Sequence, residues 1–367
     1  MERKAFLNAF NLVSFIGPKK VKSLLEYEPD AERAWNLPSH KLKCIEGWGS
    51  LADKFVIERS RIDVKKEWEK ILQKDIAVLY CDDSGYPACL REIYLPPTLL
   101  YIQGEVRADE KCVAIVGSRK ATQYGRDIAR RFAADLAATG ICVVSGMAMG
   151  IDTWAHKGAM ESGGRTVAVL GSGVDICYPQ SNLQLKKNIS CNGAVVSEFP
   201  PGTTPIPGNF PRRNRVISGM SVGTIVVEAM ERSGALITAD FALEQGREVF
   251  AVPGSINSPY SRGCNRLIKQ GAKLVENLDD VLEELGLILN KNSGKNEIVE
   301  LQKTEQLSFL SPDEEKVLST IPYEPVHADE LIQKAGINAS TVSSTLLNLE
   351  INGLIKQMPG KFFVRVK

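Results

Sequence analysis

Three arginines and an asparagine stand together in the segment Phe210-Pro211-Arg212-Arg213-Asn214-Arg215. A guanidinium stays charged and offers a planar fork of donors that fits phosphate oxygens and stacks on bases. Because the cluster follows a proline-rich loop and leads into a helical pattern, we interpret it as a phosphate- or base-binding element. Ion pairing with Glu198 or Glu228 could account for one or two of these arginines, but not readily for all three.

A second candidate is the turn Gly117-Ser118-Arg119-Lys120, which follows the apolar run 113–116. Glycine allows a ligand to come close to the backbone, and Arg119 adds another guanidinium, so the turn is typical of phosphate binding. The alternative is a tight turn between a strand and a helix, with Arg119 in solvent. No GxGxxG motif follows this run, no acidic residue stands where one would bind a ribose, and no GxxxxGK[ST] motif is present. We therefore expect no cofactor.

Further apolar runs end in the same way. The runs 141–144, 167–170 and 225–227 lead to Ser145-Gly146, to Gly171-Ser172-Gly173 and toward Ser233-Gly234. Helical patterns separate these runs, which indicates buried parallel strands in a doubly wound α/β sheet with right-handed crossovers. Their ends share one edge of the sheet, where glycines and helix N-termini favour anions.

Catalytic groups are harder to find. Asp152 and His156 follow the second glycine turn, and we interpret Asp152 as a helix N-cap rather than as a general acid. The role of His156 stays open. Because no serine or cysteine nucleophile stands at a recognisable elbow and no partner carboxylate stands at a fixed spacing, the sequence does not indicate a Ser/His or Cys/His mechanism.

The 367 residues carry 45 Lys and Arg against 44 Asp and Glu, a net charge of +1. A chain with 44% hydrophobic residues is an ordinary globular protein, which excludes one dominated by disorder. Contacts with nucleic acid must therefore come from local basic segments. Residues 111–131 form one such segment, although we interpret Arg126, Arg130 and Arg131 as a solvated helix face.

The eight cysteines include no CxxC pair, and Cys112 and Cys142 stand inside apolar runs. This usage indicates reduced core thiols in a reducing compartment. With three histidines and no clustered ligands, we expect no metal site. Because no apolar segment is long enough for a signal peptide or a membrane span, we expect a cytoplasmic protein with no membrane partner.

Composition divides the chain into four parts. Residues 1–70 are helix-rich, with two glycine turns that fit either helix-hairpin-helix motifs or a small packing module. Residues 71–287 hold the sheet, 288–308 are polar and predict a linker, and 309–367 predict three helices and a hairpin, which together make a winged helix. Its third helix would expose Ser340, Thr341, Ser343 and Ser344 but has no Lys or Arg, so duplex and protein partners both stay open.

These motifs together resemble the DNA-processing protein A family (DprA, also called Smf) of bacterial natural transformation. The resemblance covers nearly the whole chain and rests on Tyr86-Pro87, Pro96-Pro97, 116–119, 145–152, Gly171-Ser172-Gly173-Val174-Asp175, Tyr178-Pro179, 197–202, 210–215, 233–235 and 252–254. It implies an extended Rossmann-like core, a sterile-alpha-motif-like N-terminal domain and a C-terminal winged-helix domain.

The resemblance implies binding rather than catalysis, so we expect no catalytic residues and no enzyme. Members hold single-stranded DNA, form homodimers and load the RecA recombinase onto incoming strands, displacing single-strand-binding protein. The predicted DNA-binding residues are Gly117, Ser118, Arg119, Lys120, Gly146, Gly171, Ser172, Gly173, Arg212, Arg213, Asn214, Arg215, Ser233 and Gly234.

Two other functions are alternatives to strand binding. A nucleotide phosphoribohydrolase of the lysine-decarboxylase-like group needs a PGGxGTxxE motif, but alignment on Thr238 puts Ile237 where a glycine is needed and Phe241 where the catalytic glutamate is needed. A nucleotide-sensing adaptor fits the same glycine-rich edge, with the winged helix recruiting a partner.

Overall fold

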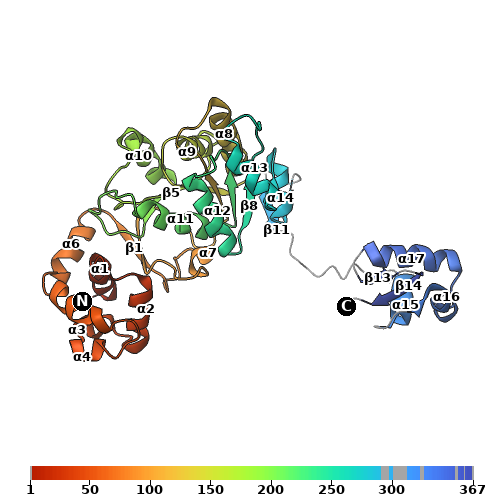
Figure 1. The fold of residues 1–367 in the computed structure, drawn as a ribbon, viewed down its shortest axis with the longest axis horizontal. Coiled ribbons are helices and arrows are strands. Elements are labelled where there is room, and N and C mark those ends of the chain that lie inside the picture. Colours follow the sequence, from red (N-terminus) through yellow and green to blue (C-terminus); the bar gives the residue numbers. More distant parts are fainter. Residues whose placement is uncertain are drawn as a thin grey trace. The chain divides into compact units, whose positions relative to one another are not determined.

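The computed structural model describes residues 2–290, 297–300, 312–322, 326–351, 354–358 and 360–365. The chain divides into two compact units, Met1–Glu300 and Leu301–Lys367. Each unit buries its own hydrophobic core. Figure 1 shows the order of the elements along the chain.

A nine-stranded sheet with the order β1-β2-β6-β5-β4-β3-β7-β8-β9 forms the centre of the first unit. The strands from β6 to β9 are parallel, and β1 and β2 run antiparallel at one edge. Short runs rich in Val and Ile are buried on both faces, as parallel strands require, which confirms the predicted fold class. The strands are β1 (Ala77–Tyr80), β2 (Leu99–Gly104), β3 (Cys112–Val116), β4 (Cys142–Ser145), β5 (Thr166–Val169), β6 (Ala194–Ser197), β7 (Gly223–Val226), β8 (Glu248–Ala251) and β9 (Lys273–Leu274).

Helices cover both faces of this sheet. Ile115 and Phe132 belong to the core on one face, and Val116 and Leu236 to the core on the other. The first face carries α8 (Gln123–Ala138), α9 (Ile151–Glu161), α10 (Leu183–Asn192) and α14 (Leu278–Glu284), and the second carries α7 (Ala88–Arg91), α11 (Asn209–Gly219), α12 (Gly234–Glu244) and α13 (Arg262–Lys269). The turn η2 (Gln180–Asn182) precedes α10.

The order of the strands reverses at β3. From β3 the chain moves through β4 and β5 to β6, then returns to place β7 on the other side of β3. Loops after neighbouring strands diverge at such a point and leave a crevice at the carboxyl ends, which is where open α/β sheets bind ligands.

The N-terminal region is helical, as predicted, and packs against the sheet edge. Its core contains Phe10, Trp35, Trp48 and Phe55 and continues into Tyr101 of β2. The helices lie beside β1 at one end of the unit in Figure 1, so residues 1–70 share a core with the edge strands. They are α1 (Arg3–Leu12), α2 (Pro18–Tyr27), α3 (Ala31–Asn36), α4 (Ser39–Leu42), η1 (Gly49–Leu51), α5 (Ala52–Arg59) and α6 (Val64–Leu72).

The structure differs from the predicted linker over part of residues 288–308. The strand β10 (Leu287–Asn290) pairs antiparallel with β11 (Glu297–Glu300), with Ile288 opposite Val299. Two short apolar runs make this ladder, but the polar residues between them dominate the composition of the segment and indicated a linker. Residues 301–308 lie outside the described residues.

The second unit is a winged helix, as predicted. Its helices are α15 (Pro312–Thr320), α16 (Ala328–Ala335) and α17 (Ala339–Ile351). Its three-stranded sheet has the order β12-β14-β13, in which β13 (Ile355–Met358) and β14 (Phe362–Arg365) form the expected hairpin. The strand β12 (Val326–His327) has only two residues and was not predicted. Asn338 caps α17 by accepting a hydrogen bond of 2.7 Å from the Thr341 amide.

Candidate nucleic-acid interface

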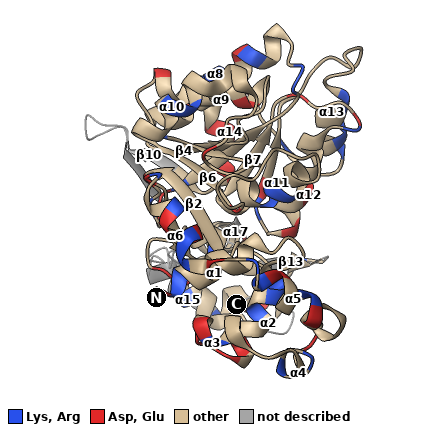
Figure 2. Ribbon diagram, turned by 90° about the vertical axis from the view of Figure 1, so that its left-hand side faces the viewer, with Lys and Arg blue, Asp and Glu red and all other residues tan. Residues whose placement is uncertain are grey.

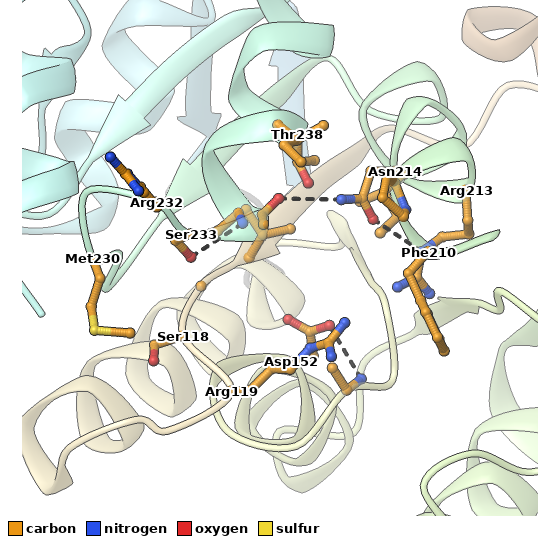
Figure 3. A pocket seen from close by; sticks show the side chains of 18 of the residues that line it. Ser118, Arg119, Asp152, Phe210, Arg213, Asn214, Met230, Arg232, Ser233 and Thr238 are labelled. Carbon is orange, nitrogen blue, oxygen red and sulfur yellow. Dashed lines mark hydrogen bonds between the residues drawn. The ribbon is translucent and has the colours of Figure 1, made fainter. Parts of the chain in front are cut away.

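A pocket of about 550 Å³ opens at the carboxyl edge of the sheet, between the turns that follow β3 and β7. We call it the edge pocket. Its polar lining includes Ser118, Arg119, Lys120, Asp152, Tyr178, Arg213, Asn214, Arg232, Ser233 and Thr238, and most of these are drawn in Figure 3. Four cations therefore face one carboxylate in a crevice at the topological switch point.

Three of the four cations are free to meet a ligand. Arg119, Lys120 and Arg232 are exposed, and among the described residues none of them has a carboxylate within 4.0 Å. The Arg119 guanidinium lies 5.3 Å from the ring centroid of Phe210, which in turn lies 5.6 Å from the ring of Tyr178. The pocket thus offers both cations and aromatic rings, the combination that binds a polynucleotide backbone and its bases.

The start of α12 points its amide groups at the pocket. Ser233 is the N-cap, and its hydroxyl accepts a hydrogen bond of 3.3 Å from the Ala235 amide. Asn214 joins this helix to α11, because its side-chain amide donates to the Gly234 carbonyl at 3.3 Å. Both helices are therefore fixed around a helix N-terminus that favours an anion.

Arg213 has a structural role. It is only 4% exposed, and its Nη1 donates to the Gly146 carbonyl at 2.7 Å and to the Val169 carbonyl. These two carbonyls lie at the ends of β4 and β5, so the guanidinium ties α11 to both strands. Burial lowers the pKa of Arg213 to about 10, which leaves it charged at neutral pH.

Glu198 forms ion pairs with the two other arginines of the cluster, Arg212 and Arg215. This carboxylate is 3% exposed and lies 2.5 Å from Arg215 and 3.3 Å from Arg212. Arg215 also donates to the Leu95 carbonyl at 2.8 Å, whereas the Arg212 side chain stays 41% exposed over the Phe199 ring. Ion pairing with Glu198 therefore accounts for two of the three arginines, in line with the expectation, while backbone carbonyls bind Arg213, so only Arg212 keeps substantial contact with solvent.

Internal packing explains three of the predicted glycines. A Cβ at Gly146 would lie 2.7 Å from an Asp152 carboxylate oxygen, and one at Gly171 would lie 2.9 Å from the Phe210 ring. At Gly117, a Cβ would lie 3.0 Å from the Glu228 carbonyl. We expected these glycines to admit a ligand, but at all three positions the crowding comes from the protein itself.

The carboxylate of Glu228 lies at the N-terminus of α8, the helix that connects β3 to β4, where a helix favours an anion. Its buried carboxylate accepts hydrogen bonds from the Thr122 amide at 2.9 Å and from the Thr122 hydroxyl at 2.5 Å, at the start of α8. In dinucleotide-binding folds the pyrophosphate sits at the corresponding helix N-terminus. The chain's own carboxylate fills that position here, so the N-terminus that faces a ligand is that of α12.

Asp152 and His156 lie buried on α9, below the pocket. Gly150 is the N-cap of α9, so the expectation that Asp152 caps this helix was wrong. Instead, its carboxylate accepts a hydrogen bond of 3.2 Å from the Ala148 amide in the preceding turn. Burial raises the pKa of Asp152 to about 6, and burial together with Arg213 lowers the pKa of His156 to about 3.

The structure brings together eight of the predicted site residues. Those that line the edge pocket are Gly117, Ser118, Arg119, Lys120, Arg213, Asn214, Ser233 and Gly234. Those outside its lining are Gly146, Gly171, Ser172, Gly173, Arg212 and Arg215. Arg232 and Met230 are lining residues that we did not predict, although Arg232 directly precedes the Ser233-Gly234 pair.

One group of possible metal ligands lies apart from this pocket. Ligand atoms of Glu110, Cys112 and Cys142 lie within 4.8 Å of one another, a cluster that the sequence did not indicate. The Glu110 carboxylate is already bound by Arg165 at 2.5 Å. The hydrogen bond that the Cys142 thiol makes to Cys112, together with burial, raises the pKa of Cys142, whereas a metal requires the thiolate. In the described residues, no helix is long and apolar enough to cross a membrane.

The fold and the pocket define a doubly wound α/β protein that presents cations, aromatic rings and a helix N-terminus at its carboxyl edge and also carries a winged helix. The chain belongs to the family of DNA recombination-mediator protein A, which matches residues 77–286. Residues 302–361 match the DprA winged helix domain. These matches confirm the resemblance noted in the sequence.

Similar proteins span most of the chain. Protein Smf of Synechocystis sp. is 34% identical over 99% of this chain and 98% of its own length. DNA processing protein DprA of Bacillus subtilis is 45% identical over 58% of this chain and 72% of its own length.

Two solved structures also match. The X-ray structure of DprA from Streptococcus pneumoniae has 36% identity and a TM-score of 0.67, covering 76% of this chain and 97% of that one. The structure of DNA processing protein A from Helicobacter pylori, which describes a single-stranded DNA binding mode, has 29% identity and a TM-score of 0.52, covering 57% of this chain and 95% of that one.

Proposed function

We propose that this protein binds single-stranded DNA in the edge pocket. Arg119, Lys120 and Arg232 would hold backbone phosphates, together with the N-terminus of α12. Phe210 and Tyr178 would stack on bases. The observation that carries this proposal is the set of three cations without ion pairs beside two aromatic rings, since the described carboxylates nearby are already engaged inside the protein.

The relative from Helicobacter pylori supports the same function, because single-stranded DNA binding is described for it. The fold shared with that protein covers more than half of this chain. A pocket that combines cations for phosphates with aromatic rings for stacking suits a binder of strands with little sequence preference.

Binding without catalysis fits the pocket better than hydrolysis of a nucleotide. Asp152 is the only carboxylate among the described lining residues, and it is buried and hydrogen-bonded to the Ala148 amide. Thr238 lines the pocket but Phe241 does not, so the helix that would carry a phosphoribohydrolase glutamate presents none there. A hydrolase needs such a group to transfer the proton.

The family description, recombination mediator, supports a finer proposal. We infer that the bound strand is protected and then passed to RecA, with displacement of single-strand-binding protein. A homodimer would join two edge pockets and raise the apparent affinity for one long strand through effective concentration.

Fluorescence anisotropy with labelled oligo-dT over a range of salt concentrations tests the proposal. We expect the logarithm of the association constant to fall by about 0.7 per phosphate contact for each unit in the logarithm of salt. Release of ribose 5-phosphate from nucleoside monophosphates, with no salt-dependent binding of oligo-dT, would instead support the hydrolase and overturn strand binding.

A further inference from the structure

A second groove gathers positive charge away from the edge pocket. It lies between α10, the strands β1 and β2 and the turn after α6, and has a volume of about 600 Å³. We call it the α10 groove. It is lined by three lysines, Lys74, Lys186 and Lys187, and by two carboxylates, Asp75 and Asp175. Basic segments lie along α10 and α6 in Figure 2.

Lys186 is a buried ammonium with incomplete compensation. The residue is 8% exposed, and its Nζ donates one hydrogen bond of 2.9 Å to the neutral side chain of Gln103. Within the described part of the chain, no carboxylate lies within 4.0 Å of it. An ammonium has three donors, and its burial without an anionic partner costs free energy. Burial accordingly lowers the pKa of Lys186.

Asp175 does not supply the missing partner. One of its carboxylate oxygens lies 2.7 Å from Lys74, and the other accepts a hydrogen bond of 2.8 Å from the Gly202 amide. Lys187 is exposed and has no ion pair among the described residues. The groove therefore presents two ammonium groups, one of them buried, that an incoming anion would satisfy.

We propose that the α10 groove binds backbone phosphates of a single strand that also occupies the edge pocket. This rests on the proposed function. Tyr178 lines the edge pocket and Asp175 lines the α10 groove. Three peptide units join them and span at most ~11 Å. A short loop therefore joins the two sites, and the strand would follow it from Tyr178 to Lys186 and Lys187.

The experiment compares two oligo-dT lengths, about 4 and about 12 nucleotides, with wild-type protein and two variants that remove the free charge differently. Lys186→Met deletes the ammonium, and Gln103→Glu keeps it but gives it a carboxylate partner. We expect each variant to bind the long oligonucleotide roughly tenfold more weakly, with a shallower salt slope, and the short one as wild type does. Lys41→Met, at an exposed position of α4, is the matched control and should bind both oligonucleotides as wild type does.

Each outcome bears on the proposal. Unchanged affinity of both variants for the long oligonucleotide, with wild-type melting temperatures, would overturn it. An equal loss for both lengths would also overturn it, because the groove would then be part of the edge pocket. If the variants lose only the binding of inorganic phosphate and keep the wild-type affinity for the long oligonucleotide, the groove binds a free anion and not a strand. That result would also overturn the proposal. Failure of the wild-type protein to bind either length would contradict the proposed function itself.

Discussion

At the scale of single residues, two arginines of the edge pocket have different roles, one toward a ligand and one inside the protein. Arg119 and Arg213 both line the edge pocket. Arg119 is exposed beside Phe210, whereas Arg213 is buried and donates to two strand-end carbonyls. The sequence predicts clustered guanidiniums, but it does not show which of them face the ends of β4 and β5. That distinction depends on how α11 crosses the sheet.

Alanine substitutions separate these two roles. Arg119→Ala should weaken oligo-dT binding about tenfold and leave the free energy of unfolding unchanged, because the side chain is exposed. Arg213→Ala should lower the free energy of unfolding by about 3 kcal/mol, because it leaves buried carbonyls without a donor. Urea denaturation and anisotropy measure both effects. Equal loss of stability in the two variants would contradict this division.

The buried groups of Asp152 and His156 should make the stability of the protein depend on pH. The pKa of Asp152 is raised to about 6. Between about pH 4 and 6, the contribution of Asp152 to the free energy of unfolding therefore falls as the pH rises. The pKa of His156 is lowered to about 3, so its contribution rises over the same range. The two contributions oppose each other in the wild-type protein.

Asp152→Asn removes one of these contributions and leaves the other. The free energy of unfolding of this variant should rise with pH between 4 and 6 more steeply than that of the wild type, by about 1.4 kcal/mol per pH unit. Urea denaturation at several pH values gives both curves. Parallel curves would show that Asp152 is ionised throughout, and Asp127→Asn, at an exposed position of α8, is the control.

At the scale of elements, apolar runs made the strands of the sheet predictable and polar surroundings hid the exceptions. The run 113–116 has no polar residue and predicts β3 directly. By contrast, β10 and β11 flank a polar segment, and β12 has two residues, too few for a pattern. The carboxylate at the start of α8 was also hidden, because Glu228 is 106 residues away from Thr122 in the chain.

Glu228→Gln tests whether that carboxylate stabilises α8. The substitution keeps the shape of the side chain but removes the charge from the helix N-terminus, so the free energy of unfolding should fall by about 1–2 kcal/mol. Glu231→Gln is the control, because Glu231 is exposed and makes only a long ion pair, 3.7 Å, with Arg262. Thermal and urea unfolding of both variants provide the comparison, and equal stability would show that α8 does not depend on the Glu228 charge.

At the scale of the whole molecule, the two units differ in what they offer to nucleic acid. All residues that line the edge pocket lie between Val116 and Thr238, inside the first unit. In the winged helix, the hydroxyls of Ser343 and Ser344 donate to carbonyls of α17 itself, at 2.9 and 3.0 Å. That helix has no Lys or Arg, so it presents no cation to a phosphate.

Residues 1–300 alone should therefore bind oligo-dT with the affinity and salt slope of the full chain, since they hold every cation of the edge pocket. Residues 301–367 alone should not bind it measurably. Anisotropy of the two fragments and the full chain, at matched salt, makes the comparison, and circular dichroism shows whether each fragment is folded. A shallower salt slope for folded 1–300 would mean that the winged helix contributes phosphate contacts after all, despite its uncharged third helix.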